Sequence, residues 1–357
     1  QFLEGLTSIP PLSVVLPVAD IFGSGGLYSN PQSTTLEKAT SAEWIYPDGT
    51  KGFQVDAGLK MQGGASRVPS KAPKHSMSLL FRNIYGAGRL NFPLFDDSPV
   101  GRFNSLQLRA MYNNSWIHWD SGQRSRGSMI RDQWVRDSLL AMGQDDAGRG
   151  TYANLYINGL YWGVYNVHER QEASHYADYN GGEEDRIDAL NSGAAIDGTT
   201  ASWNSLQNLV ENAVGSGISL SEYQQIQQKL DVVNLVDYMI INHYGGNSDW
   251  DAHNWRAAGG GPDEAIWKIF SWDAERILEG VTTNRIGVNN SGKPSRLFQN
   301  LRNSDEFRLL FADRLHKHFF NGGAMTPENT AACWMARANE LDLAIVGESA
   351  RRGDYRR

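Results

Sequence analysis

The sequence predicts an α+β protein with two lobes, a strand-rich first half and a helical second half. Short runs of β-branched and aromatic residues separated by Gly, Asn and Asp prevail up to residue 169. Apolar residues at helical spacing prevail after residue 230. The 357 residues suffice for one large domain. We therefore expect a single domain over 1–357, with an N-terminal lobe at 8–168 and a mostly helical C-terminal lobe at 169–345.

The strands of the first half are expected between clear turn signals. The strongest of these signals is Asn158-Gly159, a two-residue hairpin turn within the alternating run Thr151–Glu169. One helix interrupts the strands, from about Gly127 to Met142, and Gly143 ends it. The other expected strands are Leu12–Leu16, Ala42–Pro47, Gly52–Met61 and Ser76–Phe81, with the middle two paired across Asp48-Gly49.

The helices of the second half are expected from their caps. Asp231 caps a helix that Gly245-Gly246 stops. Asn303 or Ser304 opens the next helix, and Thr326-Pro327 opens the last one, toward Ile345. Between these helices, two short strands flank a Gly-rich turn that follows Trp255.

The composition excludes several classes of protein. Hydrophobic residues make up 40% and charged residues 20%, as in a folded globular chain. A net charge of −7 argues against nucleic-acid binding, which needs a basic surface. Cys333 is the single cysteine, so no intramolecular disulfide can form. No apolar run approaches the roughly 18 residues of a membrane span. The 11 tryptophans suit packing in the core better than carbohydrate binding. Because Gln1 is not a natural start, we expect a segment upstream of it.

Three polar residues between Asn247 and Asp273 have the spacing of a phosphotransfer site. Asp249 and Asn254 are five positions apart, and Asp273 follows the second strand of the hairpin. In protein kinases one carboxylate accepts the proton of the attacking hydroxyl, while an amide oxygen and a second carboxylate hold Mg²⁺. The spacing therefore predicts Asp249 as the catalytic residue and Asn254 and Asp273 as metal ligands.

Two other interpretations of this segment remain open. One is a solvated loop with Asx-turns. The other is a metallohydrolase site, because Asp249, Asp251 and His253 alternate and would share a face of an extended segment. Such a set suits Zn²⁺ or Mn²⁺, and Asp251 is a candidate metal ligand in either site.

Candidate nucleotide-binding residues precede this segment. Backbone N–H groups of the turn formed by Gly63, Gly64 and Ser66 can approach phosphate oxygens, and Arg67 adds charge, although an ordinary hairpin turn fits equally well. Lys74 enters the next strand and is the candidate phosphate-binding and catalytic lysine. We expect Asp132 in the first helix as its partner. We expect Glu169 at the hinge between the lobes, where a plain linker is the alternative.

The chain resembles the CotH kinase family, the spore coat protein H-like proteins, over about residues 8–345. The motifs that carry the resemblance are Gly58–Arg67, Pro73–Leu79, Leu155–Glu169, Asn247–Asn254 and Ser271–Asp273. Where the family has a second lysine after Lys74, this chain has His75.

The resemblance implies an atypical protein kinase-like fold that uses ATP and Mg²⁺, or Mn²⁺, to phosphorylate Ser/Thr hydroxyls of extracellular or coat-type proteins. It gives Asp249, Asn254 and Asp273 the roles stated above and adds Glu275 as a metal ligand. It implies a secreted or extracytoplasmic bacterial protein. The alternatives are another ATP-dependent transferase on the same fold, by AMP transfer or amino-acid ligation, and a non-catalytic pseudokinase or adhesion module. The sequence indicates no oligomeric state.

Overall fold

The computed structural model describes residues 2–215 and 217–353, which form two compact units. Unit 1 comprises the chain up to Ile130, Arg149–Arg170 and the segment that starts at Met335. Unit 2 comprises Arg131–Gly148 and Gln171–Trp334. One division falls between Arg170 and Gln171. The helix expected in the first lobe belongs to unit 2, however, and the segment from Met335 belongs to unit 1, because chain order does not dictate where an element packs.

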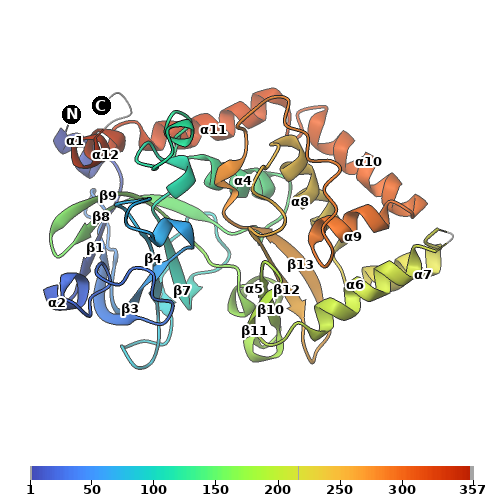
Figure 1. Ribbon diagram of the computed structural model, residues 1–357, viewed down its shortest axis with the longest axis horizontal. Helices are drawn as coiled ribbons and strands as arrows, with labels where there is room; N and C mark the ends of the chain where they lie inside the picture. Colours follow the sequence, from blue (N-terminus) through green and yellow to red (C-terminus); the bar gives the residue numbers. More distant parts are fainter. Residues whose placement is uncertain (1, 216, 354–357) are drawn as a thin grey trace. The chain divides into compact units, whose positions relative to one another are not determined.

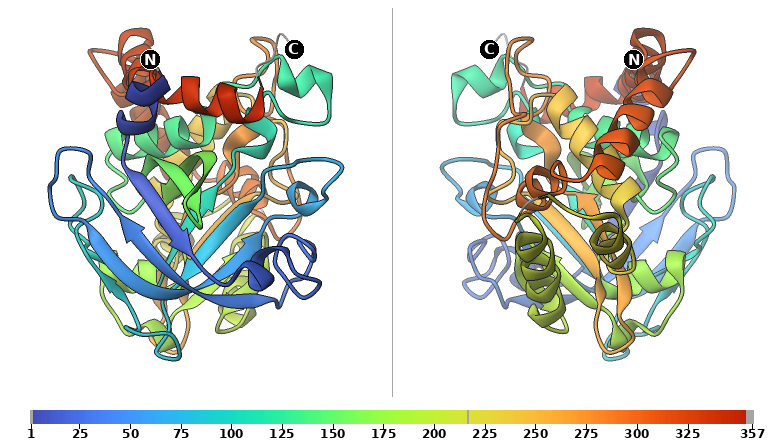
Figure 2. Two further views of the ribbon diagram at one scale, coloured as in Figure 1. Left: turned by 90° about the vertical axis from the view of Figure 1, so that its left-hand side faces the viewer. Right: turned by 90° about the vertical axis from the view of Figure 1, so that its right-hand side faces the viewer.

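Unit 1 is built on a closed seven-stranded barrel, visible at the front of the left panel of Figure 2. The barrel order is β1 (Pro11–Val15), β2 (Glu37–Trp44), β3 (Phe53–Gln62), β4 (Ser76–Leu80), β7 (Ser105–Arg109), β9 (Leu160–His168) and β8 (Gly150–Ile157). All neighbours are antiparallel except β1 and β8, which close the barrel in parallel. Each expected strand has a counterpart, but β2 begins before the expected Ala42 and ends at Trp44, and β7 was not expected. The closure was not foreseen either, because the pairing of β1 with β8 joins segments that lie far apart in the sequence.

Local turn chemistry explains two of the barrel hairpins. Asn158 and Gly159 have φ values of 50° and 77°, as the favoured two-residue hairpin turn requires. The predicted pairing across Asp48-Gly49 is also confirmed, since β2 and β3 pair from Trp44↔Phe53 onward. The connections of unit 1 hold α2 (Val18–Phe22), η1 (Ala65–Arg67), β5 (Leu90–Asn91), β6 (Arg102–Phe103), η2 (Tyr112–Asn114) and α3 (Ser121–Arg124).

Two helices from distant parts of the chain lie side by side on unit 1. They are α1 (Phe2–Thr7) and α12 (Ala344–Arg352), in blue and dark red in Figures 1 and 2. Helix α12 also packs against β9. The carbonyl oxygens of Gly5 and Leu6 at the end of α1 each accept a hydrogen bond from Asn154 of β8 at 3.1 Å. Both helices are therefore fixed to the barrel.

Unit 2 has a four-stranded antiparallel sheet with helices around it. The strand order is β11 (Ala194–Asp197), β10 (Asp188–Asn191), β12 (Trp255–Gly260) and β13 (Ala265–Ser271). The last two form the hairpin expected from the sequence, whereas β10 and β11 were missed because these strands have only four residues each. Helix α6 (Ala201–Ala213) covers the hairpin, with the Trp203 ring centroid 5.4 Å from that of Trp255.

Two helices of unit 2 begin at the predicted side-chain caps. Asp231 caps α8 (Val232–Tyr244) through the N–H of Asn234, and Ser304 caps α10 (Asp305–Phe319). Helix α4 spans Arg131–Ala141 and so begins later than expected, and α11 (Pro327–Leu341) ends before Ile345. The remaining elements are α5 (Ala173–Asn180), η3 (Glu184–Arg186), α7 (Leu220–Gln227), η4 (Ala274–Arg276) and α9 (Pro294–Leu301).

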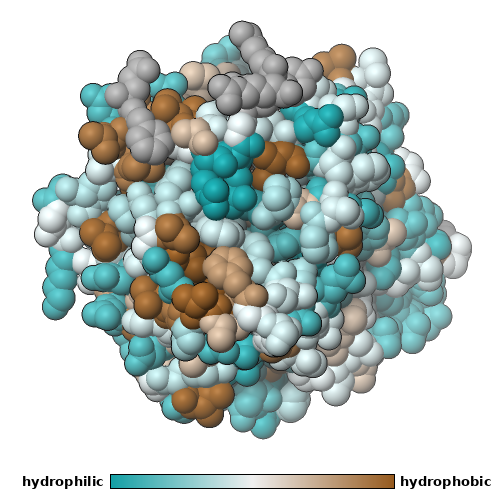
Figure 3. All heavy atoms as spheres, turned by 60° about the vertical axis from the view of Figure 1, so that its left-hand side comes forward, coloured by the Kyte–Doolittle hydropathy of each residue, from teal (hydrophilic) through white to brown (hydrophobic). Residues whose placement is uncertain are grey.

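The surface is mixed in polarity. On the face drawn in Figure 3, apolar side chains lie in small groups among hydrophilic ones, which is normal for a folded protein. Within residues 2–215 and 217–353, no helix is long and apolar enough to cross a membrane.

Candidate active site

The β12–β13 hairpin of unit 2 carries two of the three predicted phosphotransfer residues to one end of the sheet. Trp255 and Ser271 are paired across the two strands. Asn254 directly precedes Trp255, and Asp273 follows Ser271 by two residues. Since opposite residues of an antiparallel pair lie about 5 Å apart, the hairpin holds the backbones of Asn254 and Asp273 near each other.

Asp249 is hydrogen-bonded directly to Asn254. The amide nitrogen of Asn254 donates to the Asp249 carbonyl oxygen and to Asp249 Oδ2, both at 3.0 Å. His253 Nε2 lies 2.8 Å from Asp249 Oδ1. The Asp249 side chain is one-third exposed, so its carboxylate is oriented by two neighbours and still reaches solvent. The two residues that the sequence placed five positions apart thus form one hydrogen-bonded unit.

Asn254 and Asp273 share an uncommon backbone conformation. Their φ values are 65° and 59°, in the left-handed region that Asn and Asp tolerate better than most residues. Such conformations concentrate at functional sites. With its amide N–H₂ turned to Asp249, Asn254 directs its amide oxygen the other way, and no residue in the described part of the chain donates to that oxygen. An amide oxygen and a carboxylate at one end of a hairpin fit a hard cation such as Mg²⁺.

Ser192 supports Asn254 and was missed by the sequence analysis. Its hydroxyl accepts a hydrogen bond from the Asn254 N–H at 3.1 Å. Its own N–H donates to the Trp255 carbonyl at 2.9 Å, and Lys293 Nζ donates to its carbonyl at 2.8 Å. Ser192 therefore fixes the backbone of Asn254 through atoms that are themselves fixed. The contact joins residues 62 positions apart, so no local pattern indicates it.

Asp251 does not lie where the metallohydrolase interpretation requires it. Its side chain is buried and accepts hydrogen bonds from the Ser295 N–H at 2.7 Å, the Ser295 hydroxyl at 2.9 Å and the Asn290 amide at 2.7 Å. Burial raises the pKa of this carboxyl, and the bonds from Ser295 and Asn290 oppose that shift. Asp251 thus holds the first turn of α9 and does not face His253, because the segment turns where alternation assumes an extended strand.

The metallohydrolase alternative also lacks a ligand cluster. Within residues 2–215 and 217–353, no group of three or more His, Cys, Asp or Glu side chains is placed to hold a metal ion. Zinc sites of enzymes use about three such protein ligands. A kinase-type magnesium site needs fewer protein ligands, and one of them is an amide oxygen. The absence of such a cluster therefore does not argue against a magnesium site.

Asp132 and Glu275 lie around the segment that follows Asp273. Asp132 Oδ1 accepts a hydrogen bond from the Ala274 N–H at 2.7 Å, and Asp132 Oδ2 lies 3.4 Å from Arg136 Nε. The Glu275 side chain is buried, and its carbonyl oxygen accepts from Arg131 at 3.2 Å. The start of α4 therefore positions the backbone next to Asp273, which is a supporting role for Asp132.

The Gly-rich turn of unit 1 follows β3 directly. Gly63 has φ 111°, and a Cβ atom there would lie 2.1 Å from Ser66 Oγ, so the turn requires glycine. Ser66 is buried, and its carbonyl oxygen lies 2.8 Å from His75 Nδ1. Arg67 donates to the carbonyl oxygens of Gln32 and Ser33, both at 3.0 Å. Its guanidinium is therefore bound to a neighbouring loop. Gly64 has open space around it.

Lys74 forms a buried ion pair with Glu348 of α12, at 2.9 Å. Both side chains are fully buried, and Lys74 also donates to the Val164 carbonyl oxygen and lies 4.7 Å from the centre of the Tyr165 ring. Burial lowers the pKa of Lys74, and Glu348 acts against that shift. Glu348, rather than the expected Asp132, is the partner of Lys74. The two residues are 274 positions apart, so sequence spacing gave no sign of the pair.

Glu169 lies at the end of β9, beside the division between the two units. Its side chain is buried, and its carboxylate accepts a hydrogen bond from the Arg149 N–H at 2.6 Å. Its own N–H donates to the Arg149 carbonyl at 3.0 Å. Glu169 thus ties the end of β9 to the segment that begins at Arg149. This arrangement fits a linker residue as well as it fits a residue that contacts a nucleotide.

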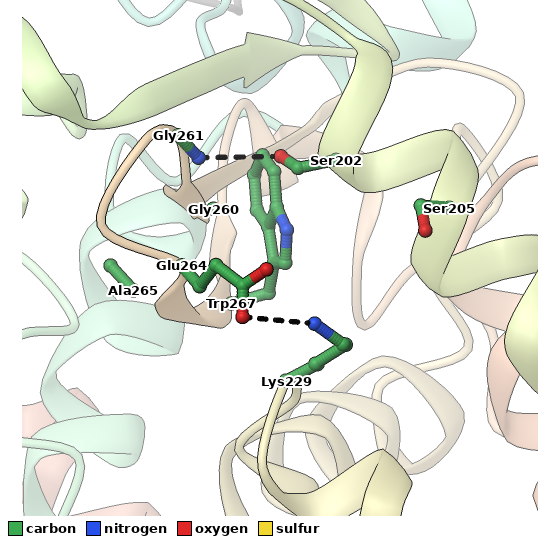
Figure 4. A pocket seen from close by; sticks show the side chains of 8 residues that line it. All are labelled: Ser202, Ser205, Lys229, Gly260, Gly261, Glu264, Ala265 and Trp267. Carbon is green, nitrogen blue, oxygen red and sulfur yellow. Dashed lines mark hydrogen bonds and ion pairs between the residues drawn. The ribbon is translucent and has the colours of Figure 1, made fainter.

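A small hollow of about 180 Å³ lies at the opposite end of the β12–β13 hairpin (Figure 4). Trp267 and the turn residues Gly260 and Gly261 form part of its wall. Lys229 and Glu264 approach each other across it at 3.4 Å. Because the strands separate this hollow from Asn254 and Asp273, it is not part of the candidate site.

The fold is a mixed α+β fold with a seven-stranded barrel in unit 1 and a four-stranded sheet in unit 2. A family model described as CotH kinase protein matches residues 101–342, about two-thirds of the chain. The chain belongs to the CotH kinase family. A search of curated proteins finds no match. The matched range contains Asp249, Asn254 and Asp273, whereas Gly58–Arg67 and Lys74 precede it.

Proposed function

We propose that this protein is an ATP- and Mg²⁺-dependent kinase that phosphorylates Ser/Thr hydroxyls of a protein substrate. The single observation that carries the proposal is the hydrogen-bonded set of Asp249 and Asn254 at the hairpin end that also bears Asp273. Membership of the CotH kinase family supports the same reaction class. The choice of extracellular or coat-type substrates, and of a secreted location, rests on the family resemblance.

Each residue of the set has a distinct role in this reaction. Asp249, oriented by His253 and Asn254, accepts the proton of the acceptor hydroxyl while the hydroxyl oxygen bonds to the terminal phosphorus of ATP and the bond from that phosphorus to the leaving ADP breaks. Asn254 and Asp273 would hold Mg²⁺, or Mn²⁺, with Glu275 as a further carboxylate beside Asp273. The bound cation would neutralise phosphate charge. Asp132 and Ser192 keep the backbones of the two metal ligands in place.

The test compares two substitutions at the site with two matched controls. Asp249→Asn keeps one acceptor oxygen for Asn254, so ATP–Mg²⁺ binding measured by calorimetry should persist while transfer from γ-labelled ATP falls by about 10² to 10⁴. Asp273→Ala should lose both. Asp263, on the turn of the same hairpin and paired with exposed Arg186, provides Asp263→Asn and Asp263→Ala as controls with unchanged binding and transfer.

The labelling pattern separates the alternatives. Transfer of the α-label in place of the γ-label would indicate AMP transfer on the same fold. ATP binding without any transfer would indicate a pseudokinase. Transfer at the wild-type rate by Asp249→Asn would remove Asp249 from the mechanism.

A further inference from the structure

The hollow at the turn end of the β12–β13 hairpin has no role in the proposed kinase reaction. It lies wholly within unit 2 and has a volume of about 180 Å³. Its wall comes from the start of α6, from the segment that joins α7 to α8, and from the hairpin with its turn. Three separate parts of the chain therefore meet around a space that admits only a small ligand.

Trp267 presents an unused hydrogen-bond donor to this hollow. The residue is 1% exposed, and its ring packs against Trp203 of α6, with the ring centroids 5.2 Å apart. The indole N–H has no acceptor among the residues that the structure describes. In Figure 4 the indole nitrogen lies on the side of the ring that faces Ser205 and Lys229. Since buried tryptophans usually pair this N–H, it is a donor that a ligand oxygen can meet at the wall of the hollow.

Ser205 and Lys229 add two further donors on that side. Ser205 is exposed, and its hydroxyl forms no hydrogen bond with any residue in 2–215 or 217–353. Lys229 Nζ lies 3.4 Å from Glu264 Oε2, and the two side chains are 39% and 77% exposed. An exposed ion pair of this kind contributes little to stability, so Lys229 can turn to a ligand at small cost.

The other polar side chains of the hollow are acceptors. The Ser202 hydroxyl donates its one proton to Asp188 Oδ2 at 2.7 Å, so its oxygen is left to accept hydrogen bonds. Asp188 is buried and places a negative charge directly behind Ser202. Glu264 contributes a second carboxylate at the rim. A ligand that is only an anion would meet these two carboxylates, and a ligand that is only a cation would meet Lys229.

We propose that this hollow binds a small zwitterion, of the class of the free α-amino acids with a short side chain. The ligand carboxylate accepts hydrogen bonds from Trp267, Ser205 and Lys229. The ligand ammonium donates to Glu264 and to the Ser202 oxygen. The two charges of the ligand take the place of the Lys229–Glu264 pair, so neither side chain loses its counter-charge. The site does not depend on the proposed kinase reaction.

The test is calorimetric titration of four probes into the wild-type protein. The probes are L-alanine, acetate, methylammonium and glycerol. L-Alanine should bind at least about 10-fold more tightly than each of the others, because it alone satisfies both charged side chains. Binding of acetate or methylammonium as tight as that of L-alanine would show that one charge suffices and would overturn the proposal. Tighter binding of glycerol, or no binding of L-alanine, would overturn it as well.

Two substitutions of exposed side chains test the contacts. Lys229→Met removes a charge-assisted hydrogen bond and should weaken L-alanine binding by about 10- to 100-fold. Glu264→Gln keeps the shape of the side chain and should weaken it by about 10-fold. The matched controls are Lys317→Met, at an exposed position of α10, and Asp263→Asn, next to Glu264 and paired with Arg186. Both controls should bind L-alanine as the wild type does, whereas wild-type affinity in either test variant would overturn the proposal.

Trp267→Phe separates the indole N–H from the ring. It keeps an aromatic ring against α6 and should weaken L-alanine binding by about 5-fold, the effect of one lost hydrogen bond. Equal affinity with an unchanged melting temperature would remove Trp267 from the site. None of these substitutions touches Asp249, Asn254 or Asp273, so transfer from γ-labelled ATP should stay at the wild-type rate. Failure of the kinase proposal therefore leaves this test intact, and failure of this test leaves the kinase proposal intact.

Discussion

Replacement of Lys74 by methionine should destabilise unit 1 strongly, because it removes one partner of a buried ion pair. The Lys74 and Glu348 side chains are fully buried, and their charged atoms lie 2.9 Å apart. At an effective dielectric constant of about 20, that distance corresponds to about 6 kcal/mol of attraction. The variant loses this attraction and keeps a buried carboxylate, so we expect the free energy of unfolding to fall by about 3–5 kcal/mol.

The Glu348 carboxylate has a second contact that limits its relaxation. Its other oxygen accepts the Val164 N–H at 2.6 Å, beside Gly163, whose φ is 125°. A Cβ atom on Gly163 would lie 2.4 Å from that oxygen, so the strand is shaped around the carboxylate. Glu348 therefore cannot turn to solvent when Lys74 is removed unless α12 detaches from β9.

Urea unfolding of Lys74→Met, Glu348→Gln and the double variant measures the coupling. The double variant contains no buried charge at this place, so its destabilisation should be about 2 kcal/mol smaller than the sum of the two single effects. Lys71→Met, a partly exposed lysine of the same unit, should change stability by less than about 1 kcal/mol. A loss below 1 kcal/mol for Lys74→Met, or strict additivity, would refute the buried-pair reasoning.

Three further predictions concern unit 2. Asp251→Ala should lower the free energy of unfolding by about 2–4 kcal/mol, because it leaves Ser295 at the start of α9 without a hydrogen-bond acceptor. The affinity for Mg²⁺ should not change. A loss of Mg²⁺ affinity without a loss of stability would restore Asp251 as a metal ligand. Burial and nearby arginines lower the pKa of His243 from 6.5 to about 4. His243 therefore takes up a proton on unfolding below pH 6.5, and the free energy of unfolding should fall by about 2 kcal/mol between pH 7.5 and 5. In urea unfolding measured across this range, His243→Phe should remove that part of the pH dependence. An unchanged pH dependence in the variant would contradict the assignment to His243. Glycine suits the φ of 55° at Ser192, so Ser192→Gly removes the hydroxyl without straining the backbone. The variant should bind ATP several-fold more weakly in the presence of Mg²⁺, while its melting temperature without ligand stays within a few degrees of wild type. ATP binding equal to that of the wild type would show that Asn254 needs no support from Ser192.

The features that the sequence predicted are those with local causes. The Asn158-Gly159 turn, the Asp231 and Ser304 caps and the β12–β13 hairpin depend on residues a few positions apart. The contact between Asp249 and Asn254 is also local, and its hydrogen bonds agree with the spacing that suggested it. Such features can be read from a single sequence, because the residue type at each position determines the backbone conformation there.

The features that the sequence did not predict depend on long-range packing. The parallel pairing of β1 with β8 closes the barrel, and nothing in either strand specifies the other. Lys74 was assigned to the nucleotide because its position beside a strand is visible in the sequence, whereas Glu348 and the burial of both residues are not. Asp251 was grouped with His253 on the assumption of an extended segment, which the turn at 249–254 breaks.

The pairing of Lys74 with Glu348 has a consequence for synthesis of the chain on the ribosome. The barrel strands up to β9 emerge long before α12, so the first unit to appear must wait for the last described helix. Until then its lysine has no counter-charge, and the surface of β9 against which α12 packs is uncovered. Unit 1 therefore completes after unit 2 has been translated, and a chain that stops before Glu348 should be held by chaperones or degraded rather than accumulate as a folded barrel.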